Sequence, residues 1–169
     1  MTEKKEVIPG MRPIDVVLEY LGLALLLLSI LNIFWQYDAL PDRVAIHFDS
    51  TGTADGWSGK ASLFVVPVIF AFSFVLIGLV SRFVSPENYN HPGKYAPGKE
   101  QRMYALSRTM IHGMQASIGF VSLYAANHLV EHNTTTDPVS NIFNLWVILG
   151  AILLPILIYL YFFLKERKA

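Results

Sequence analysis

The chain has 169 residues, about the length of one domain, and 53% of them are hydrophobic whereas only 15% are charged. Soluble domains carry about 25% charged residues, so this composition, with a mean hydropathy of +0.43, predicts an integral membrane protein. The net charge is zero, so no global field attracts nucleic acid and we expect no nucleic-acid partner. The absence of cysteine excludes disulfide bonds, thiolate chemistry and cysteine-based zinc sites.

Four segments approach the length of about 20 mostly apolar residues that a membrane-spanning helix needs. They are residues 14–37, 63–84, 104–130 and 142–164. We therefore expect an all-α integral membrane protein, a four-helix transmembrane bundle formed by a single membrane domain of residues 1–169 that contacts membrane lipids. The third segment is the weakest, because it carries several polar side chains. The alternative is three spans, with residues 104–130 as a buried or surface helix.

The distribution of lysine and arginine predicts the direction of the spans. Eleven of these residues lie in the N-terminal segment, in or beside the loop 85–103, and at the C-terminus, whereas only Arg43 and Lys60 lie in between on the other side. Because basic residues collect on the cytoplasmic side, both termini and the loop 85–103 should be cytoplasmic in a multi-pass protein of the cell membrane. The loop 38–62 should then face outward.

Ionisable side chains inside a membrane are costly, so each one is a candidate for function. Glu19 and Arg108 fall at similar depths from the cytoplasmic side, and we expect them to form an ion pair. Arg108, His112 and Gln115 share one helix face, since they are spaced i, i+4 and i+7. Three interpretations of this face stay open. It is a polar stripe that holds helices together, or it is a path for a ligand or proton in a small transporter or lipid-handling protein. In the third interpretation, the Arg108 side chain extends to the lipid headgroups.

The outer loop 38–62 has too much local order in its sequence for a random linker. Residues 44–48 form a short strand-like run, and two turn sequences rich in aspartate and glycine follow it. We expect a compact, ordered cap on the outer face. Its candidate contacts to a ligand or partner are His47, Asp49, Asp55, Trp57 and Lys60. The alternatives are that His47 and Asp49 only brace the turn, or that the loop binds a peptide, a lipid headgroup or a metal.

A second group of polar residues lies at the outer end of the third segment. His128, Glu131 and His132 match the H-x-x-E-H pattern of some zinc peptidases, and two histidines four residues apart can ligate one metal. With His47 on the same side, the three histidines are weak candidates for a divalent metal site. The alternatives are a helix end at the membrane interface, which is favoured, and a peptidase, for which a third ligand is hard to find. We predict no cofactor and no catalytic residue.

Several of these residues carry a resemblance to a known family. They are Leu40 and Pro41, residues 46–48, Gly52, residues 55–57, Lys60 and Pro67, followed by residues 88–92 and 100–106. Over residues 14–130 the chain resembles domain of unknown function 1648, the membrane domain that begins SdpI-type immunity proteins. Those proteins continue with further spans, so this chain looks like a stand-alone form. The resemblance implies a non-enzymatic bacterial protein of toxin immunity or peptide-stress signalling, with a peptide toxin outside or a repressor inside as partner.

Overall fold

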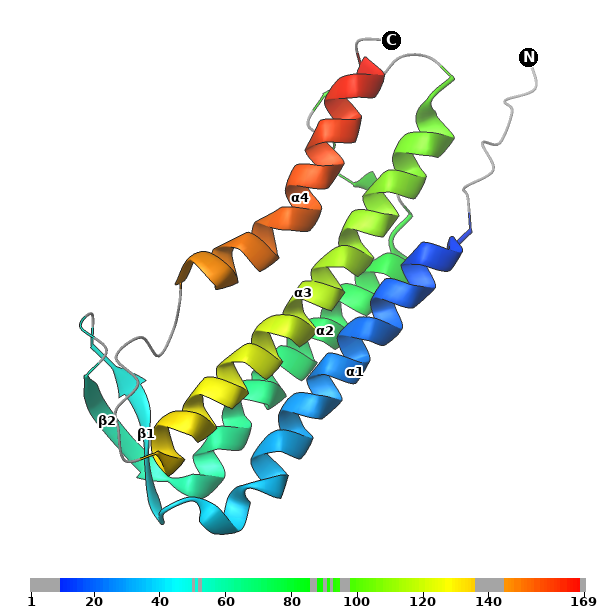
Figure 1. The fold of residues 1–169 in the computed structure, drawn as a ribbon. Coiled ribbons are helices and arrows are strands. Elements are labelled where there is room, and N and C mark those ends of the chain that lie inside the picture. Colours follow the sequence, from blue (N-terminus) through cyan, green and yellow to red (C-terminus); the bar gives the residue numbers. More distant parts are fainter. Residues whose placement is uncertain are drawn as a thin grey trace.

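The protein is mostly helical, and the part of the chain that the structure describes contains four long helices and one β-hairpin (Figure 1). The computed structural model describes residues 10–49, 51, 53–85, 88–89, 91, 93–94, 98–135 and 145–167. The helices are α1 (Pro13–Trp35), α2 (Val65–Phe83), α3 (Glu100–Thr134) and α4 (Leu145–Arg167), and the strands are β1 (Arg43–Phe48) and β2 (Ala54–Gly59). Two short 3-10 helices, η1 (Tyr37–Ala39) and η2 (Lys60–Phe64), flank the hairpin. The four long helices lie within a few residues of the predicted spans, except that residues 142–144 lie outside the described residues.

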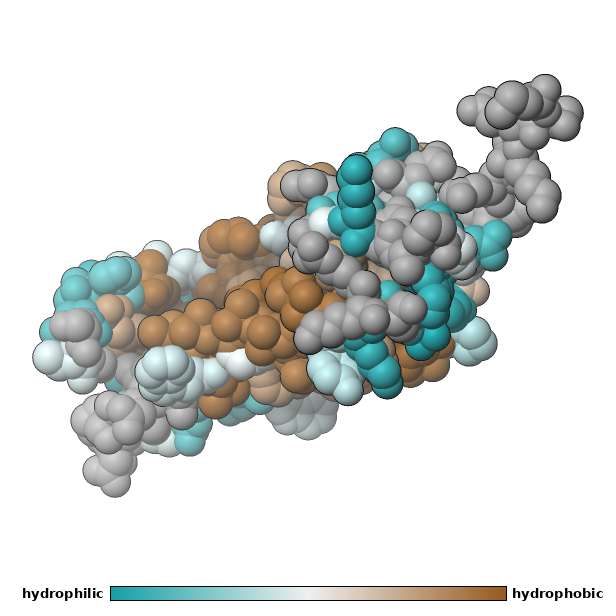
Figure 2. All heavy atoms as spheres, turned by 90° about the horizontal axis from the view of Figure 1, so that it is seen from above, coloured by the Kyte–Doolittle hydropathy of each residue, from teal (hydrophilic) through white to brown (hydrophobic). Residues whose placement is uncertain are grey.

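Three of the helical segments are long and apolar enough to span a membrane: Pro13–Trp35, Lys60–Phe83 and Leu145–Glu166. This supports the prediction of a membrane protein. Hydrophobic side chains cover the middle of the face in Figure 2, and hydrophilic side chains gather towards both of its ends. The helix α3 lacks this apolar character, although its 35 residues extend over about 52 Å. It packs against α1, α2 and α4, so its polar side chains can meet other helices instead of lipid.

Small residues bring α1 and α3 together along their length. Gly22 and Gly119 meet where the two backbones touch, and neither position has room for a Cβ atom. Two turns after Gly22 on α1 and one turn after Gly119 on α3, the hydroxyl groups of Ser29 and Ser122 are hydrogen-bonded at 2.9 Å in a fully buried contact. Helices in lipid associate through such close packing and through interhelical hydrogen bonds rather than through the hydrophobic effect. Asn32 of α1 adds a further interhelical hydrogen bond, since its side-chain amide donates to Asn127 Oδ1 of α3 at 2.8 Å.

The helix α4 contains a proline whose missing hydrogen bond is replaced by its neighbour α3. Pro155 has no N–H to donate to the carbonyl of Ala151, four residues earlier, and α4 changes direction along its length (Figure 1). The hydroxyl of Ser117 on α3 donates to that carbonyl at 2.6 Å. Gly113 leaves space for the proline ring, because a Cβ there would lie 2.8 Å from Pro155. This is how a proline is accommodated in a membrane helix.

Substitution of Ser117 should therefore destabilise the α3–α4 contact. We expect Ser117→Ala to lower the free energy of unfolding by about 1 kcal/mol, because the Ala151 carbonyl is left without a partner. In a Pro155→Ala background the same change should cost less, since residue 155 then supplies its own N–H. A double-mutant cycle measured by thermal unfolding in detergent tests this coupling. Equal costs in both backgrounds would contradict it.

The loop between α1 and α2 is a hairpin, so the all-α prediction is wrong in this segment. The strand-like run was predicted, but its partner β2 was read as turn sequence. The strands are antiparallel, with Ala45 opposite Trp57, and the register is irregular beyond that pair. At the turn, Asp49 Oδ1 accepts hydrogen bonds from the backbone N–H groups of Thr51 and Thr53, at 2.8 and 3.0 Å. Asp49 thus braces the turn, as one of the two interpretations had it.

The hairpin is fixed to the bundle through the inner side of β1. Val44 is fully buried in a hydrophobic cluster that joins the ends of α1 and α3 to the segments flanking the hairpin. The members of this cluster are Ile33, Leu40, Val44, Leu63, Ala126, Leu129 and Val130. The amide of Asn133 adds two hydrogen bonds, accepting from Ala45 N–H at 2.7 Å and donating to the Ala45 carbonyl at 3.1 Å. The side chain of Asn133 thus takes the place of a neighbouring strand along β1.

Candidate functional site

The exposed face of the hairpin carries two of the predicted contact residues side by side on β2. Asp55 and Trp57 alternate with more buried residues, as expected for a strand with one covered face, and Trp57 is 52% exposed. Because the Ala45 backbone points to Asn133, away from β2, Ala45 and Trp57 form a pair without hydrogen bonds between them. The N–H and C=O of Trp57 therefore point to the outer edge of β2. Among the described residues, no third strand pairs with this edge.

The other predicted contact residues divide between the exposed face and the base of the hairpin. His47 Nδ1 lies 2.5 Å from Asp55 Oδ1, and both side chains are largely exposed. Lys60 lies at the base, with Nζ 4.8 Å from the centre of the Tyr37 ring and 3.8 Å from an Asp42 carboxylate oxygen. His47, Asp55 and Trp57 thus form one exposed surface, which we call the hairpin face, whereas Asp49 and Lys60 hold the hairpin in shape.

The histidines considered for a metal each contact a different partner. His128 packs edge-on against Tyr124, with ring centres 4.4 Å apart, and its Nδ1 lies 4.0 Å from Glu131. The His132 ring packs edge-on against Phe48 at 4.7 Å. His47 Nδ1 contacts the Asp55 carboxylate. Within the described parts of the chain, no group of three metal-ligating side chains is assembled.

Acidification should weaken the attachment of the hairpin through His132. Burial lowers the pKa of His132 from its ordinary value of 6.5. The unfolded chain then takes up this proton more readily than the folded chain, so the stability contribution is complete above about pH 6.5 and is lost as the pH falls below it. The protection factors of the amides of residues 43–48, which correct each exchange rate for the intrinsic rate at the same pH, should be lower at about pH 5.5 than at about pH 7.5, and His132→Phe should remove the difference. A difference that persists in His132→Phe would show that His132 is not the responsible group.

The polar side chains within the bundle form a network between α1, α2 and α3. The predicted ion pair of Glu19 with Arg108 is wrong. Glu19 Oε1 instead forms an ion pair with Arg82 Nη2 of α2, at 2.5 Å. Arg108 instead lies near Tyr89, whose pKa is raised by burial while the charge of Arg108 acts in the opposite direction. The reason is the rotation of α3 about its own axis, which turns the face that carries His112 and Gln115 towards Ser81 and Phe74 of α2. From the sequence alone, Arg82 is one of the basic residues beside the loop 85–103 that predict the cytoplasmic side.

His112 and Gln115 lie at the centre of this network and are fully buried. The Gln115 carbonyl oxygen can only accept, so His112 Nδ1 carries a proton and donates to it at 2.8 Å. His112 Nε2 lies 2.9 Å from the Ser81 hydroxyl, and the Gln115 amide donates to the Phe74 carbonyl at 3.1 Å. These contacts tie α3 to α2 at two levels, which supports the interpretation of the polar stripe as a structural element.

A buried carboxylate at the start of α1 was missed. Asp15 is fully buried, accepts from the Arg12 N–H at 2.8 Å and from the Thr109 hydroxyl, and lies near the Arg12 guanidinium. Arg12 in turn donates to the Thr109 hydroxyl and, at 3.1 Å, to the Ala105 carbonyl. The sequence signal was Pro13 at the first helical position with an acidic residue two further on, a usual helix start.

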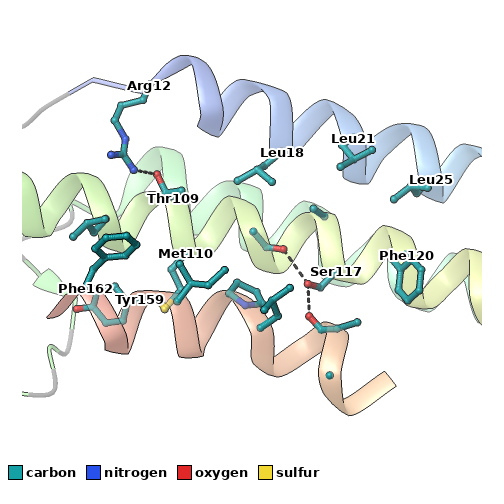
Figure 3. A pocket seen from close by; sticks show the side chains of 18 of the residues that line it. Arg12, Leu18, Leu21, Leu25, Thr109, Met110, Ser117, Phe120, Tyr159 and Phe162 are labelled. Carbon is teal, nitrogen blue, oxygen red and sulfur yellow. Dashed lines mark hydrogen bonds between the residues drawn. The ribbon is translucent and has the colours of Figure 1, made fainter. Parts of the chain in front are cut away.

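A groove of about 910 Å³ lies between α1, α3 and α4 (Figure 3). Its walls are apolar, with Leu18, Leu21 and Leu25 directed from α1 and Tyr159 and Phe162 from α4. Two arginines, Arg12 and Arg102, line it together with Thr109 and Ser117, and no carboxylate is among its described lining residues. No sequence pattern indicated this groove, because it depends on the position of α4 against α3.

Residues 24–71 match the family model of a domain of unknown function, DUF1648, the domain found in SdpI-type proteins. The match runs from the middle of α1 through the hairpin into α2. The chain is thus similar to this domain in the segment that builds the hairpin face, within a mostly helical protein that has three candidate membrane-spanning helices. No curated protein and no solved structure matches it.

Proposed function

We propose that this chain is a non-enzymatic protein of the bacterial cell membrane that recognises an extended peptide with its hairpin face, as a toxin-immunity or peptide-stress protein would. In this proposal α3 is a fourth span, both termini are cytoplasmic and the hairpin faces outward. The bias of lysine and arginine supports this direction. The burial of α3 among the apolar helices supports its insertion.

The observation that carries the proposal is the asymmetry between the two edges of the hairpin. The inner edge of β1 is occupied by Asn133, whereas the N–H and C=O of Trp57 point outward from β2 without a strand partner among the described residues. An extended peptide can add to such an edge by backbone hydrogen bonds, and neighbouring side chains then select its sequence. Trp57 offers a large rigid contact surface, and the His47–Asp55 pair lies beside it. The anchored base keeps this surface preorganised, which reduces the entropic cost of binding.

Transport along the polar stripe has less support from the geometry. His112 and Gln115 are buried, and their polar atoms are engaged in hydrogen bonds within the bundle. A conducted ligand or proton would have to break contacts that hold α2 and α3 together.

The test is expression in a sensitive bacterium challenged with peptide toxins of several classes. We expect the wild-type chain to protect against at least one class, and Trp57→Ala to lose this protection at equal membrane abundance. Trp35→Ala is the matched control, because Trp35 is also exposed but lies at the end of α1 outside the hairpin face. Equal killing with and without the protein across all toxin classes would refute the proposal, as would full protection by Trp57→Ala.

A further inference from the structure

The groove between α1, α3 and α4 has its charged residues at one end only. Arg12 precedes α1 and Arg102 lies in the first turn of α3, and both helices begin at the end of the bundle opposite the hairpin (Figure 1). The Arg12 side chain is 37% exposed and that of Arg102 is 58% exposed. From this end the groove continues between apolar side chains to Phe120 and Trp146.

The charges at this end leave an excess of positive charge. Arg102 lies 2.9 Å from a carboxylate oxygen of Glu166, but Lys99 shares the same carboxylate at 2.8 Å. Arg12 has the buried Asp15 carboxylate 3.9 Å from its Nε, so Arg12, Arg102 and Lys99 are balanced by only two carboxylates. An anion that reaches Arg12 and Arg102 together would meet partly exposed guanidinium groups, which bind phosphate in a fixed geometry.

The dimensions of the groove fit one leaflet of a bilayer. The α1 wall from Arg12 to Leu25 extends over about 20 Å, at about 1.5 Å per residue. One leaflet, including its headgroup region, is about 20–22 Å thick. The volume of about 910 Å³ lies within the range of about 300–1,000 Å³ that is usual for small-molecule sites.

We propose that this groove binds one anionic phospholipid, with the phosphate at Arg12 and Arg102 and the acyl chains between α1 and α4. The gradient from charged to apolar along one groove matches the structure of a phospholipid. A second copy of the chain would fit less well, because it would have to bring a carboxylate to the arginines and only apolar side chains to the rest. Bound lipid would also fill the space that separates α4 from α1.

The test is native mass spectrometry of the full chain, extracted from vesicles of equal phosphatidylglycerol and phosphatidylcholine content. Wild-type protein should retain phosphatidylglycerol in preference. Arg102→Gln should reduce this preference about fivefold, as expected for loss of one basic residue near a lipid phosphate, whereas Lys94→Gln, an exposed control, should not. Gly150→Phe should reduce retention of both lipids, because Gly150 lines the groove and a Cβ added there has no atom within 4 Å, which leaves the aromatic ring free to occupy the groove.

Thermal unfolding of each variant separates loss of lipid from loss of fold. Folded Gly150→Phe and Arg102→Gln proteins that retain lipid like the wild type would overturn the proposal. The chain has no cysteine, so a single Leu21→Cys variant reports contact between two copies. An efficient disulfide-linked dimer of this variant, without bound lipid, would show that a second copy occupies the groove and would also overturn the proposal.

Discussion

Gly119→Ala should lower the free energy of unfolding by about 3 kcal/mol or more, the largest effect expected for a glycine-to-alanine substitution among the described glycines. The added Cβ would overlap the carbonyl oxygen of Gly22, which belongs to the backbone of α1 and cannot turn aside as a side chain can. The two helices would have to separate. Separation would also break the buried contact between Ser29 and Ser122.

The matched control is Gly150→Ala, since that position on α4 has no neighbouring atom within 4 Å of the added Cβ. It should raise the stability by about 0.5–1 kcal/mol, because alanine is the better helix former. Unfolding in detergent, followed by circular dichroism or by the fluorescence of the tryptophans, measures both variants. Equal effects of the two substitutions would show that α1 and α3 are not in close contact.

His112→Ala should have the second large effect, a loss of about 3 kcal/mol. Removal of the buried imidazole leaves a cavity, and it takes a hydrogen-bond partner from the Ser81 hydroxyl and from the Gln115 carbonyl oxygen. Unpaired polar groups in the interior cost more than the hydrogen bond itself contributes.

His128→Ala is the control for this prediction, because His128 is on the same helix but its side chain is 23% exposed. It should cost well under half as much. Chemical denaturation at neutral pH measures the difference between the two variants. A loss of function in His112→Ala without loss of stability would point instead to a conducting role of the polar stripe.

The positions of the helices along the chain could be predicted from the sequence. The rotation of each helix about its axis, which decides which face meets which neighbour, could not. The length of the apolar segments predicts α1, α2 and α4 directly, and the basic residues indicate where these helices end. The partner of Glu19 could not be predicted, because Arg82 and Arg108 fall at comparable depths and only the rotation of α3 towards α2 decides between them. The strand β2 was missed for a different reason. Its residues Ala54–Gly59 have low intrinsic strand preference and pair because β1 is already fixed to the bundle.

For the candidate site too, residue types could be predicted from the sequence, but the positions of the side chains in the fold could not. His47, Asp55 and Trp57 were predicted from residue type, and the hairpin brings them to one face. Asp49 and Lys60 have the same chemical types but hold the turn and the base of the hairpin. Asn133 was missed as an anchor of β1 because nothing in its local sequence indicates which backbone it meets.

The central position of α3 has a consequence for the order in which the protein is assembled. Insertion of a helix from the translocon into lipid depends on the hydrophobicity of that helix, and α3 has too little to enter lipid alone. If α3 spans the membrane, it can insert only by packing against α1 and α2, where Gly22 and Ser81 contact it. In that case a nascent chain that lacks α1 would release α3 to the aqueous side, and α1 would act as an intramolecular insertion factor for α3.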